Sequence, residues 1–195
     1  MTAVYQLKIS LDRTKPSIWR RFFVEEGMSF HKLHLIIQEV MGWENYHLYD
    51  FNINQSRITL PDSDWDDPEK IMDSKKTKVK DLVLKQKFFY TYDFGDCWEH
   101  TILVEKILPK EQDKIYPRCV EGKFACPPED CGSTSGYYHL LEIRANKKHL
   151  EYKRLIKEWL GEDYDPNKLD IEDINNKLLK YIKVDGRTKY WVKKK

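Results

Sequence analysis

The sequence lacks any long apolar run: no stretch approaches the roughly 18 uncharged residues that a membrane-spanning helix needs. Its first ten residues, MTAVYQLKIS, hold no basic region followed by an apolar segment, which a secretion signal would require. We therefore expect a cytoplasmic protein that is neither exported nor embedded in a membrane. With only 4 cysteines and that compartment, we expect thiols or metal ligands rather than a disulfide framework.

The sequence also lacks the common catalytic templates, since it has no nucleophile elbow, no glycine-rich phosphate loop and no HExxH motif. The absence of these templates does not exclude an enzyme. Net charge is small as well, because 34 basic residues nearly balance 32 acidic ones to give +2. No strong overall field draws the chain to nucleic acid, so such binding would depend on a local patch.

One basic patch stands out at the C-terminus, where tyrosine and tryptophan alternate with positive charges. Its charged members are Arg187, Lys189, Lys193, Lys194 and Lys195, with Tyr190 and Trp191 between them. Charge runs at chain ends are more typical of a solvated terminus than of a nucleic-acid-binding arm. Nucleic acid therefore stays a weakly supported partner.

What the chain does have is a large share of core-forming residues, with 41% hydrophobic and 13% aromatic. This composition predicts a folded protein, and 195 residues suit one domain spanning residues 1–195. We expect a sheet-rich core over residues 1–136, with an ordered cysteine segment at its end, and a helical part over residues 137–195.

Hydrophobic periodicity predicts strands and helices in a definite order. Alternating patterns indicate strands near residues 5–11, 18–24, 46–53, 88–94 and 98–108. Ser29 is a suitable N-cap and Gly42 a stop for an early helix, and the Gly95-Asp96 pair favours a hairpin. The breaker-rich stretch 109–136 is predicted to be a structured loop, followed by helices over 137–145, 149–160 and 171–182. This order favours an α+β fold with a mixed, mainly antiparallel sheet, one early helix packed on it and a C-terminal helical segment.

Four stretches make the chain resemble the plasmid pRiA4b ORF-3-like family. They are Pro16–Arg20, Leu33–Phe51 with its LH, MGW and HLYDF elements, Tyr92–His100 (YDFGDCWEH) and Cys119–Gly136 (CVEGKFACPPEDCGSTSG). The family name records only an open reading frame on a plasmid, and some relatives are labelled passenger proteins of insertion-sequence elements. The resemblance thus implies a genetic setting rather than a mechanism. Ser133 departs from the family, which more often shows glycine there.

Unusual polar residues concentrate in two of these stretches, and we predict that they line one pocket walled by tryptophan. The candidate pocket residues are Asp93, Asp96, Trp98, Glu99, His100, Glu129 and Asp130. Strand alternation would send Asp96, Trp98 and His100 to one face. The alternative is structural: the aspartates cap turn amides, and His100 is a hydrogen-bonded strand residue.

A zinc site is a second prediction from the same region. Cys119, Cys126 and Cys131 offer thiolates, and His100 or Cys97 would be the fourth ligand. The C-x6-C-x4-C spacing lacks the close CxxC pair of established zinc sites, so buried or reactive thiols are the competing interpretation. His34 lies on the apolar stripe of its helix and is predicted to be a satisfied core histidine.

Three functions remain open from the sequence. The leading hypothesis is a non-enzymatic binding or interaction module whose ligand enters the polar pocket. The second is a metal-assisted hydrolase that uses the carboxylates together with His100. The third is a DNA-associated accessory protein, suggested by the plasmid setting and the basic tail. All pocket-based hypotheses require the hairpin tip to face the cysteine segment across a shared cavity.

Overall fold

The computed structural model describes residues 2–61, 71–184 and 187–188 of the chain. Within these residues, eight strands form one mixed sheet in the order β5-β4-β3-β6-β7-β1-β2-β8. All neighbouring pairs are antiparallel except β4 and β5, which run parallel. The strands are β1 (Ala3–Leu11), β2 (Trp19–Glu25), β3 (Tyr49–Ile53), β4 (Ser56–Thr59), β5 (Ile71–Asp73), β6 (Lys87–Tyr92), β7 (Trp98–Pro109) and β8 (Arg118–Lys123), with a separate pair, β9 (Lys183–Val184) and β10 (Arg187–Thr188).

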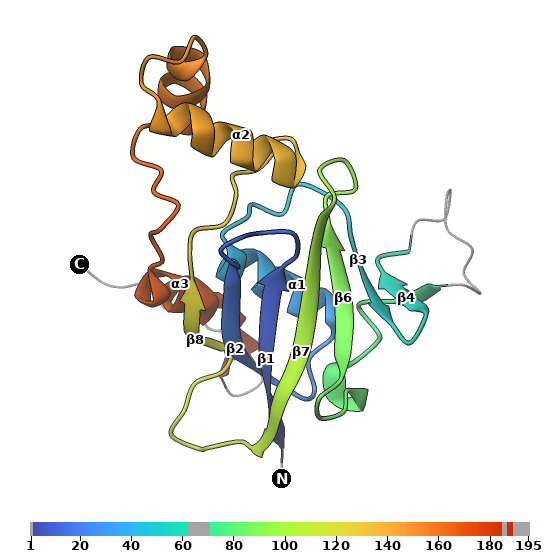
Figure 1. Cartoon of the computed structure of the whole chain (residues 1–195). Helices are drawn as coiled ribbons and strands as arrows, with labels where there is room; N and C mark the ends of the chain where they lie inside the picture. The colour runs from blue at the N-terminus through green and yellow to red at the C-terminus, as the bar shows by residue number, and fades with distance from the viewer. Residues whose placement is uncertain (1, 62–70, 185–186, 189–195) are drawn as a thin grey trace.

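The helices confirm the predicted α+β class. They are α1 (Phe30–Met41), α2 (Ser133–Ala145), a π-helix (Tyr152–Leu160) and α3 (Ile171–Leu178), with short 3-10 turns at Val79–Asp81 and Leu179–Tyr181. Figure 1 shows α1 lying against one face of the sheet, α3 beside the edge strand β8, and α2 with the π-helix projecting beyond the end of the sheet. The early helix on the sheet and the helical C-terminal segment are therefore as predicted.

Helix α1 begins and ends where the sequence indicates. The Ser29 hydroxyl accepts a hydrogen bond from the Lys32 amide at 3.2 Å, and Gly42 closes the helix in the left-handed region at φ +100°. A serine side chain satisfies an otherwise orphaned amide, and glycine reaches positive φ without a Cβ clash. The apolar stripe of α1 faces the sheet, so Leu33 and Ile37 are fully buried.

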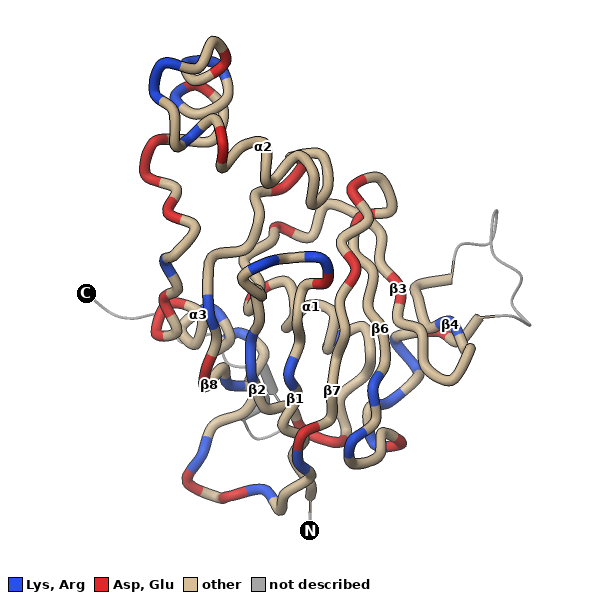
Figure 2. Tube along the Cα trace, viewed as in Figure 1, with Lys and Arg blue, Asp and Glu red and all other residues tan. Residues whose placement is uncertain are grey.

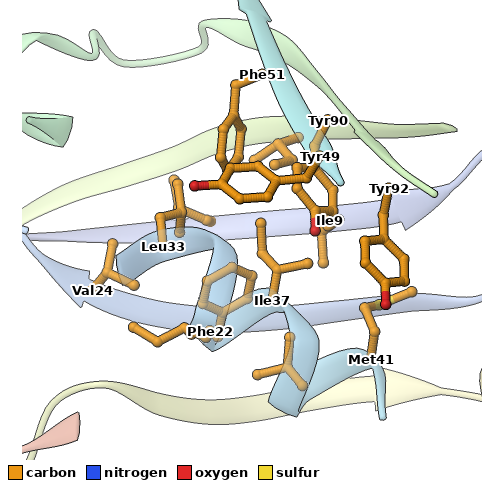
Figure 3. Close-up of a cluster of buried hydrophobic side chains, with 14 of the residues drawn as sticks. Ile9, Phe22, Val24, Leu33, Ile37, Met41, Tyr49, Phe51, Tyr90 and Tyr92 are labelled. Carbon is orange, nitrogen blue, oxygen red and sulfur yellow. The ribbon is translucent and has the colours of Figure 1, made fainter. Parts of the chain in front are cut away.

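The core lies between α1 and the sheet and is unusually rich in tyrosine. Figure 3 shows Leu33, Ile37 and Met41 of α1 directed toward side chains from the strands, among them Phe51 and Tyr90. Both aromatic residues are fully buried, and their rings lie 4.8 Å apart between centroids. Burying phenol groups requires partners for their hydroxyls, and α1 supplies polar groups for this purpose.

Two expectations need correction. Residues 109–136 were expected to lack strands, yet Arg118–Lys123 forms the edge strand β8 against β2. The breaker within it, Gly122, is required by packing, because a Cβ there would lie 2.7 Å from the Trp19 carbonyl oxygen. The strand expected over 46–53 begins only at Tyr49, since the chain turns through positive φ at Asn45.

Figure 2 shows basic and acidic positions scattered along the trace, with neither sign confined to one part of the molecule. Residues 189–195, which hold all the lysines of the predicted C-terminal patch, lie outside the described residues, whereas Arg187 belongs to β10. Among the described residues, no helix combines the length and apolar character needed to cross a membrane.

Candidate functional site

The hairpin tip between β6 and β7 touches the proline loop, which we define as residues 124–132 between β8 and α2. The Asp96 carboxylate accepts a hydrogen bond from the Gly132 amide at 3.0 Å. The end of α1 holds the same loop, since the Trp43 indole donates to the Pro127 carbonyl at 3.0 Å. The two segments that concentrate the unusual residues are therefore neighbours in space.

Beside this contact lies an acidic cluster of one histidine and three carboxylates: His47, Asp93, Glu129 and Asp130. The His47 Nε2 atom is 3.2 Å from Asp130 Oδ1, 3.6 Å from Asp93 Oδ2 and 4.0 Å from Glu129 Oε2. One ligand atom each from His47, Asp93 and Asp130 lie within 4.8 Å of one another. Imidazole and carboxylate at this spacing form a possible metal-binding group.

Local backbone conformation directs two of these aspartates. Asp93 follows β6 at φ +55° and Asp130 stands in the proline loop at φ +53°, both in the left-handed region that aspartate tolerates better than most residues. The Asp93 amide donates to the Leu48 carbonyl at 2.9 Å, and its Oδ1 accepts from the Gly95 amide at 2.9 Å. Because Oδ1 is taken by the turn, Oδ2 is left to face His47.

Among the described residues, only one of the two carboxylate oxygens of Glu129 is hydrogen-bonded. Its Oε1 accepts hydrogen bonds from the Glu44 amide at 2.8 Å and from the Tyr92 hydroxyl at 3.1 Å. Its Oε2 is buried and has no hydrogen-bond partner in the described part of the chain, and the same is true of His47 Nε2. Burial raises the pKa of Glu129, because the charged form loses solvation that the partners only partly replace.

The amino-acid sequence matches the family described as Plasmid pRiA4b ORF-3-like protein over residues 3–173. The chain belongs to this family. It is 32% identical over 198 residues to the uncharacterized protein y4hQ of Sinorhizobium fredii, covering all of this chain and 97% of that protein. Among solved structures, it is similar to a protein of unknown function, MM3350, from Methanosarcina mazei Go1. The TM-score is 0.81 with 38% identity, covering 89% of this chain and 98% of the other.

In this pRiA4b ORF-3-like chain, several of the predicted pocket residues contact other groups and do not belong to the acidic cluster. Glu99 forms an ion pair with Arg13 at the surface. Trp98 is fully buried, with its ring 5.9 Å from that of Trp43. His100 is also fully buried, its Nδ1 lies 3.2 Å from the Tyr90 carbonyl oxygen, and burial lowers its pKa to about 4. Trp98 Nε1 and His100 Nε2 have no hydrogen-bond partner among the described residues.

The cysteines of this family member do not gather around His100. In the described part of the chain, no three of Cys119, Cys126, Cys131 and His100 bring their ligand atoms within 4.8 Å of one another. The reason is topological, because Cys119 belongs to strand β8 whereas Cys131 directly precedes α2. All four cysteines are free thiols, and Cys97 is exposed. Burial raises the pKa of Cys119 and Cys126, and that of Cys131 to about 12, which favours the protonated thiol over the thiolate that metals bind.

Sequence reasoning did not select His47 as a ligand. It falls within the stretch expected as a strand, where a histidine has no distinct signal, although its HLYDF element belongs to one of the four stretches that resemble the pRiA4b ORF-3-like family. In the structure His47 precedes β3 and meets Asp93 at the end of β6, because β3 and β6 pair from Tyr49 and Tyr92 onward. The strand pairing that joins these positions could not be read from the sequence.

Proposed function

We propose that this protein is a metal-binding module whose divalent cation lies between His47, Asp93 and Asp130. The observation that carries the proposal is the convergence of one imidazole and two carboxylate atoms within 4.8 Å. A cation there would supply the missing partner of the buried His47 Nε2. Buried polar atoms without a partner are uncommon and usually mark an ion, a water or a functional role.

Charge supports the same placement. Three carboxylates surround one imidazole in a partly buried setting, so the cluster carries an excess of negative charge. A bound cation would offset the repulsion among the carboxylates. It would also stabilise the charged form of Glu129, which burial disfavours. The mixed nitrogen and oxygen donors suit zinc or manganese better than magnesium or calcium, which favour oxygen ligands alone.

A metal-assisted hydrolase is the second candidate, and Glu129 is the residue that favours it. Its free Oε2 lies 4.0 Å from the ligand atom of His47 and its pKa is raised by burial. A carboxylate so placed would accept a proton from a metal-bound water. The sequence also suggested Asp96 and Glu99 as ligands or bases for this reaction. Both have other partners in the structure, since Asp96 accepts from the Gly132 amide and Glu99 pairs with Arg13.

The test is metal binding to chelator-treated protein, measured by titration calorimetry with Zn²⁺, Mn²⁺ and Mg²⁺ and by elemental analysis after dialysis. We expect one equivalent of Zn²⁺ or Mn²⁺ to bind. His47→Gln should weaken binding by about 100-fold or more, because it removes the only nitrogen ligand of the group. His139→Gln is the matched control, since His139 is half exposed and pairs with Glu151 outside the cluster.

Equal affinity in the His47→Gln and wild-type proteins would overturn the proposed site. The hydrolase candidate has a separate test, in which p-nitrophenyl phosphate and p-nitrophenyl acetate are offered to the metal-loaded protein. If the protein is a hydrolase of this kind, Glu129→Gln should still bind the metal but should no longer turn over either substrate. A loaded protein that turns over neither substrate would leave the binding module as the function and remove esterase and phosphatase chemistry.

A further inference from the structure

A cavity away from the acidic cluster is formed by Arg20 of β2 together with three other parts of the chain. Its volume is about 450 Å³, which is within the range of small-molecule sites. The end of α1 forms one side, residues 125–126 after β8 form another, and residues 163–177 form the third. No member of the acidic cluster lines it, so this cavity is independent of the proposed metal site.

Arg20 forms the buried part of this cavity. Only 1% of its surface is exposed, yet no ion pair compensates its charge within the described residues. Its Nε donates to the Val40 carbonyl at 2.7 Å, and its Nη1 donates to the Trp19 and Lys123 carbonyls at 2.9 Å each. Within the described residues these three bonds engage Nε and Nη1 only, which leaves Nη2 for a ligand in the cavity that Arg20 lines. A buried guanidinium that meets only neutral carbonyls is costly, and an anion at Nη2 would offset that cost.

The fold holds this arginine rigidly. Arg20 pairs with Gly122 across β2 and β8, and a Cβ on Gly122 would lie 2.9 Å from Arg20 Cδ. Glycine at this position therefore leaves the space through which the arginine side chain passes. With three carbonyl oxygens fixing the guanidinium, a ligand would meet a donor whose orientation is already set, which lowers the entropy cost of binding.

The mouth of the cavity has the opposite charge. Figure 2 shows acidic positions along the segment that joins the π-helix to α3. Asp173, in the first turn of α3, pairs with Lys177 at 2.8 Å. Asp170 is the N-cap residue of α3 and accepts a hydrogen bond from the Asp173 amide at 2.9 Å. Asp163 and Asp165 also line the cavity, and neither pairs with a basic side chain among the described residues. Lys168 is the remaining cation at the mouth.

We propose that this cavity binds a small zwitterion of the α-amino acid class, with its carboxylate on Arg20 and its ammonium group toward Asp163 and Asp165. A simple anion would satisfy Arg20 but would meet the acidic mouth, and a simple cation would meet the buried guanidinium. A ligand with both charges satisfies both ends. Apolar walls from Val40, Met41 and Ile174 would contact its side chain.

The experiment is titration calorimetry of the full chain with each proteinogenic L-amino acid, with acetate and ethylamine as half-ligands. We expect at least one amino acid to bind tenfold or more tightly than either half-ligand, since each charge-assisted hydrogen bond contributes about that factor. The double variant Asp163→Asn with Asp165→Asn should weaken amino-acid binding by roughly tenfold, whereas acetate, which no longer meets the two negative charges, should bind at least as tightly as it does to wild type. Asp113→Asn, an exposed acid remote from this cavity, is the matched control.

Ala125→Leu tests the location without touching Arg20, whose removal could prevent folding. Ala125 lines the cavity and its amide bonds the Pro166 carbonyl, which a leucine preserves. We expect binding to be lost while the thermal midpoint stays within a few degrees. Failure of every amino acid to bind, acetate binding as tightly as the best amino acid, or binding that survives Ala125→Leu would each overturn the proposal. His47→Gln should leave amino-acid binding intact, which separates this result from the metal test.

Discussion

Two histidines from neighbouring parts of the chain occupy opposite situations. His34 on α1 is 1% exposed, with its Nδ1 2.8 Å from the Tyr90 hydroxyl and its Nε2 2.6 Å from Asn45 Oδ1. His47 is less buried, yet its Nε2 faces carboxylates without a hydrogen bond. Burial alone therefore does not distinguish a structural histidine from a ligand. The distinguishing feature is what the ring nitrogens face: both nitrogens of His34 have hydrogen-bond partners, whereas Nε2 of His47 faces a group of carboxylates.

The network around His34 also fixes its protonation state. Asn45 Oδ1 can only accept, so His34 Nε2 carries the proton and Nδ1 accepts from the Tyr90 hydroxyl. The Tyr90 oxygen in turn accepts from Gln38 Nε2 at 2.9 Å. The His34 ring stacks on Tyr49 with 3.6 Å between centroids. Every polar atom in this part of the core has a role, whereas the acidic cluster leaves two atoms open.

The largest expected effect is loss of stability in acid. Burial lowers the pKa of His34 to about 3 and that of His100 to about 4, against 6.5 for the free side chain. Between pH 6.5 and 4 the unfolded chain therefore binds protons that the folded chain does not, so stability falls as pH falls. Urea unfolding should show a loss on the order of 4 kcal/mol between pH 7 and pH 4.5 for the two histidines together.

In the metal-free protein, Glu129 changes stability with pH in the opposite direction to the two histidines. Its pKa is raised, so its contribution to stability is present at low pH and is lost as pH rises through the raised pKa. Saturating metal should remove this opposing term, because a cation favours the ionised carboxylate. The acid-induced loss should then be larger with metal than without it. Stability that is flat from pH 7 to 4.5 would contradict the assignment of His34 and His100 as neutral core residues.

The next effect comes from replacing His34 itself. His34→Leu removes both hydrogen bonds and leaves Asn45 Oδ1 without its donor, so we expect unfolding free energy at pH 7 to fall by about 3 kcal/mol. The same variant should lose less stability in acid than wild type, because one of the two titrating histidines is gone. Its metal affinity should not change. A large loss of metal affinity in folded His34→Leu protein would break the distinction between the two histidines.

The fold was more predictable than the site because its signals are local. Ser29 and Gly42 bound α1 by capping chemistry that three or four residues determine. The β6–β7 hairpin likewise follows from its turn residues. Strand β8 was missed because its glycine resembles a breaker until the neighbouring Trp19 carbonyl is placed beside it.

The candidate site depends on long-range pairing instead. Asp93, Glu129 and Asp130 were selected from the sequence as unusual residues, but His47 joins them only through the pairing of β3 with β6 and the docking of the proline loop. The cysteines were over-weighted for a related reason. Their residue type suggests metal, while their distances depend on where β8 carries Cys119.

The smallest expected effect concerns backbone strain at the junction between the proline loop and α2. Ser133 lies at φ +67°, directly after Gly132 at φ +86°, and its hydroxyl makes no hydrogen bond among the described residues. A serine in the left-handed region is strained, although glycine also gains more entropy in the unfolded chain. Ser133→Gly should therefore raise the unfolding free energy slightly, by about 0.5 kcal/mol, in urea denaturation.

Ser135→Gly makes the same substitution two residues later and should have the opposite sign. Ser135 lies within α2, is not at positive φ, and donates from its hydroxyl to the Gly132 carbonyl at 3.3 Å. Glycine there loses helix propensity and that bond, so we expect a destabilisation of about 1 kcal/mol. If both variants shift stability in the same direction, the loop is not strained at Ser133. Opposite signs would place the backbone strain at Ser133, directly after the proline loop that carries Glu129 and Asp130, and strained backbone is common where a fold holds a binding site.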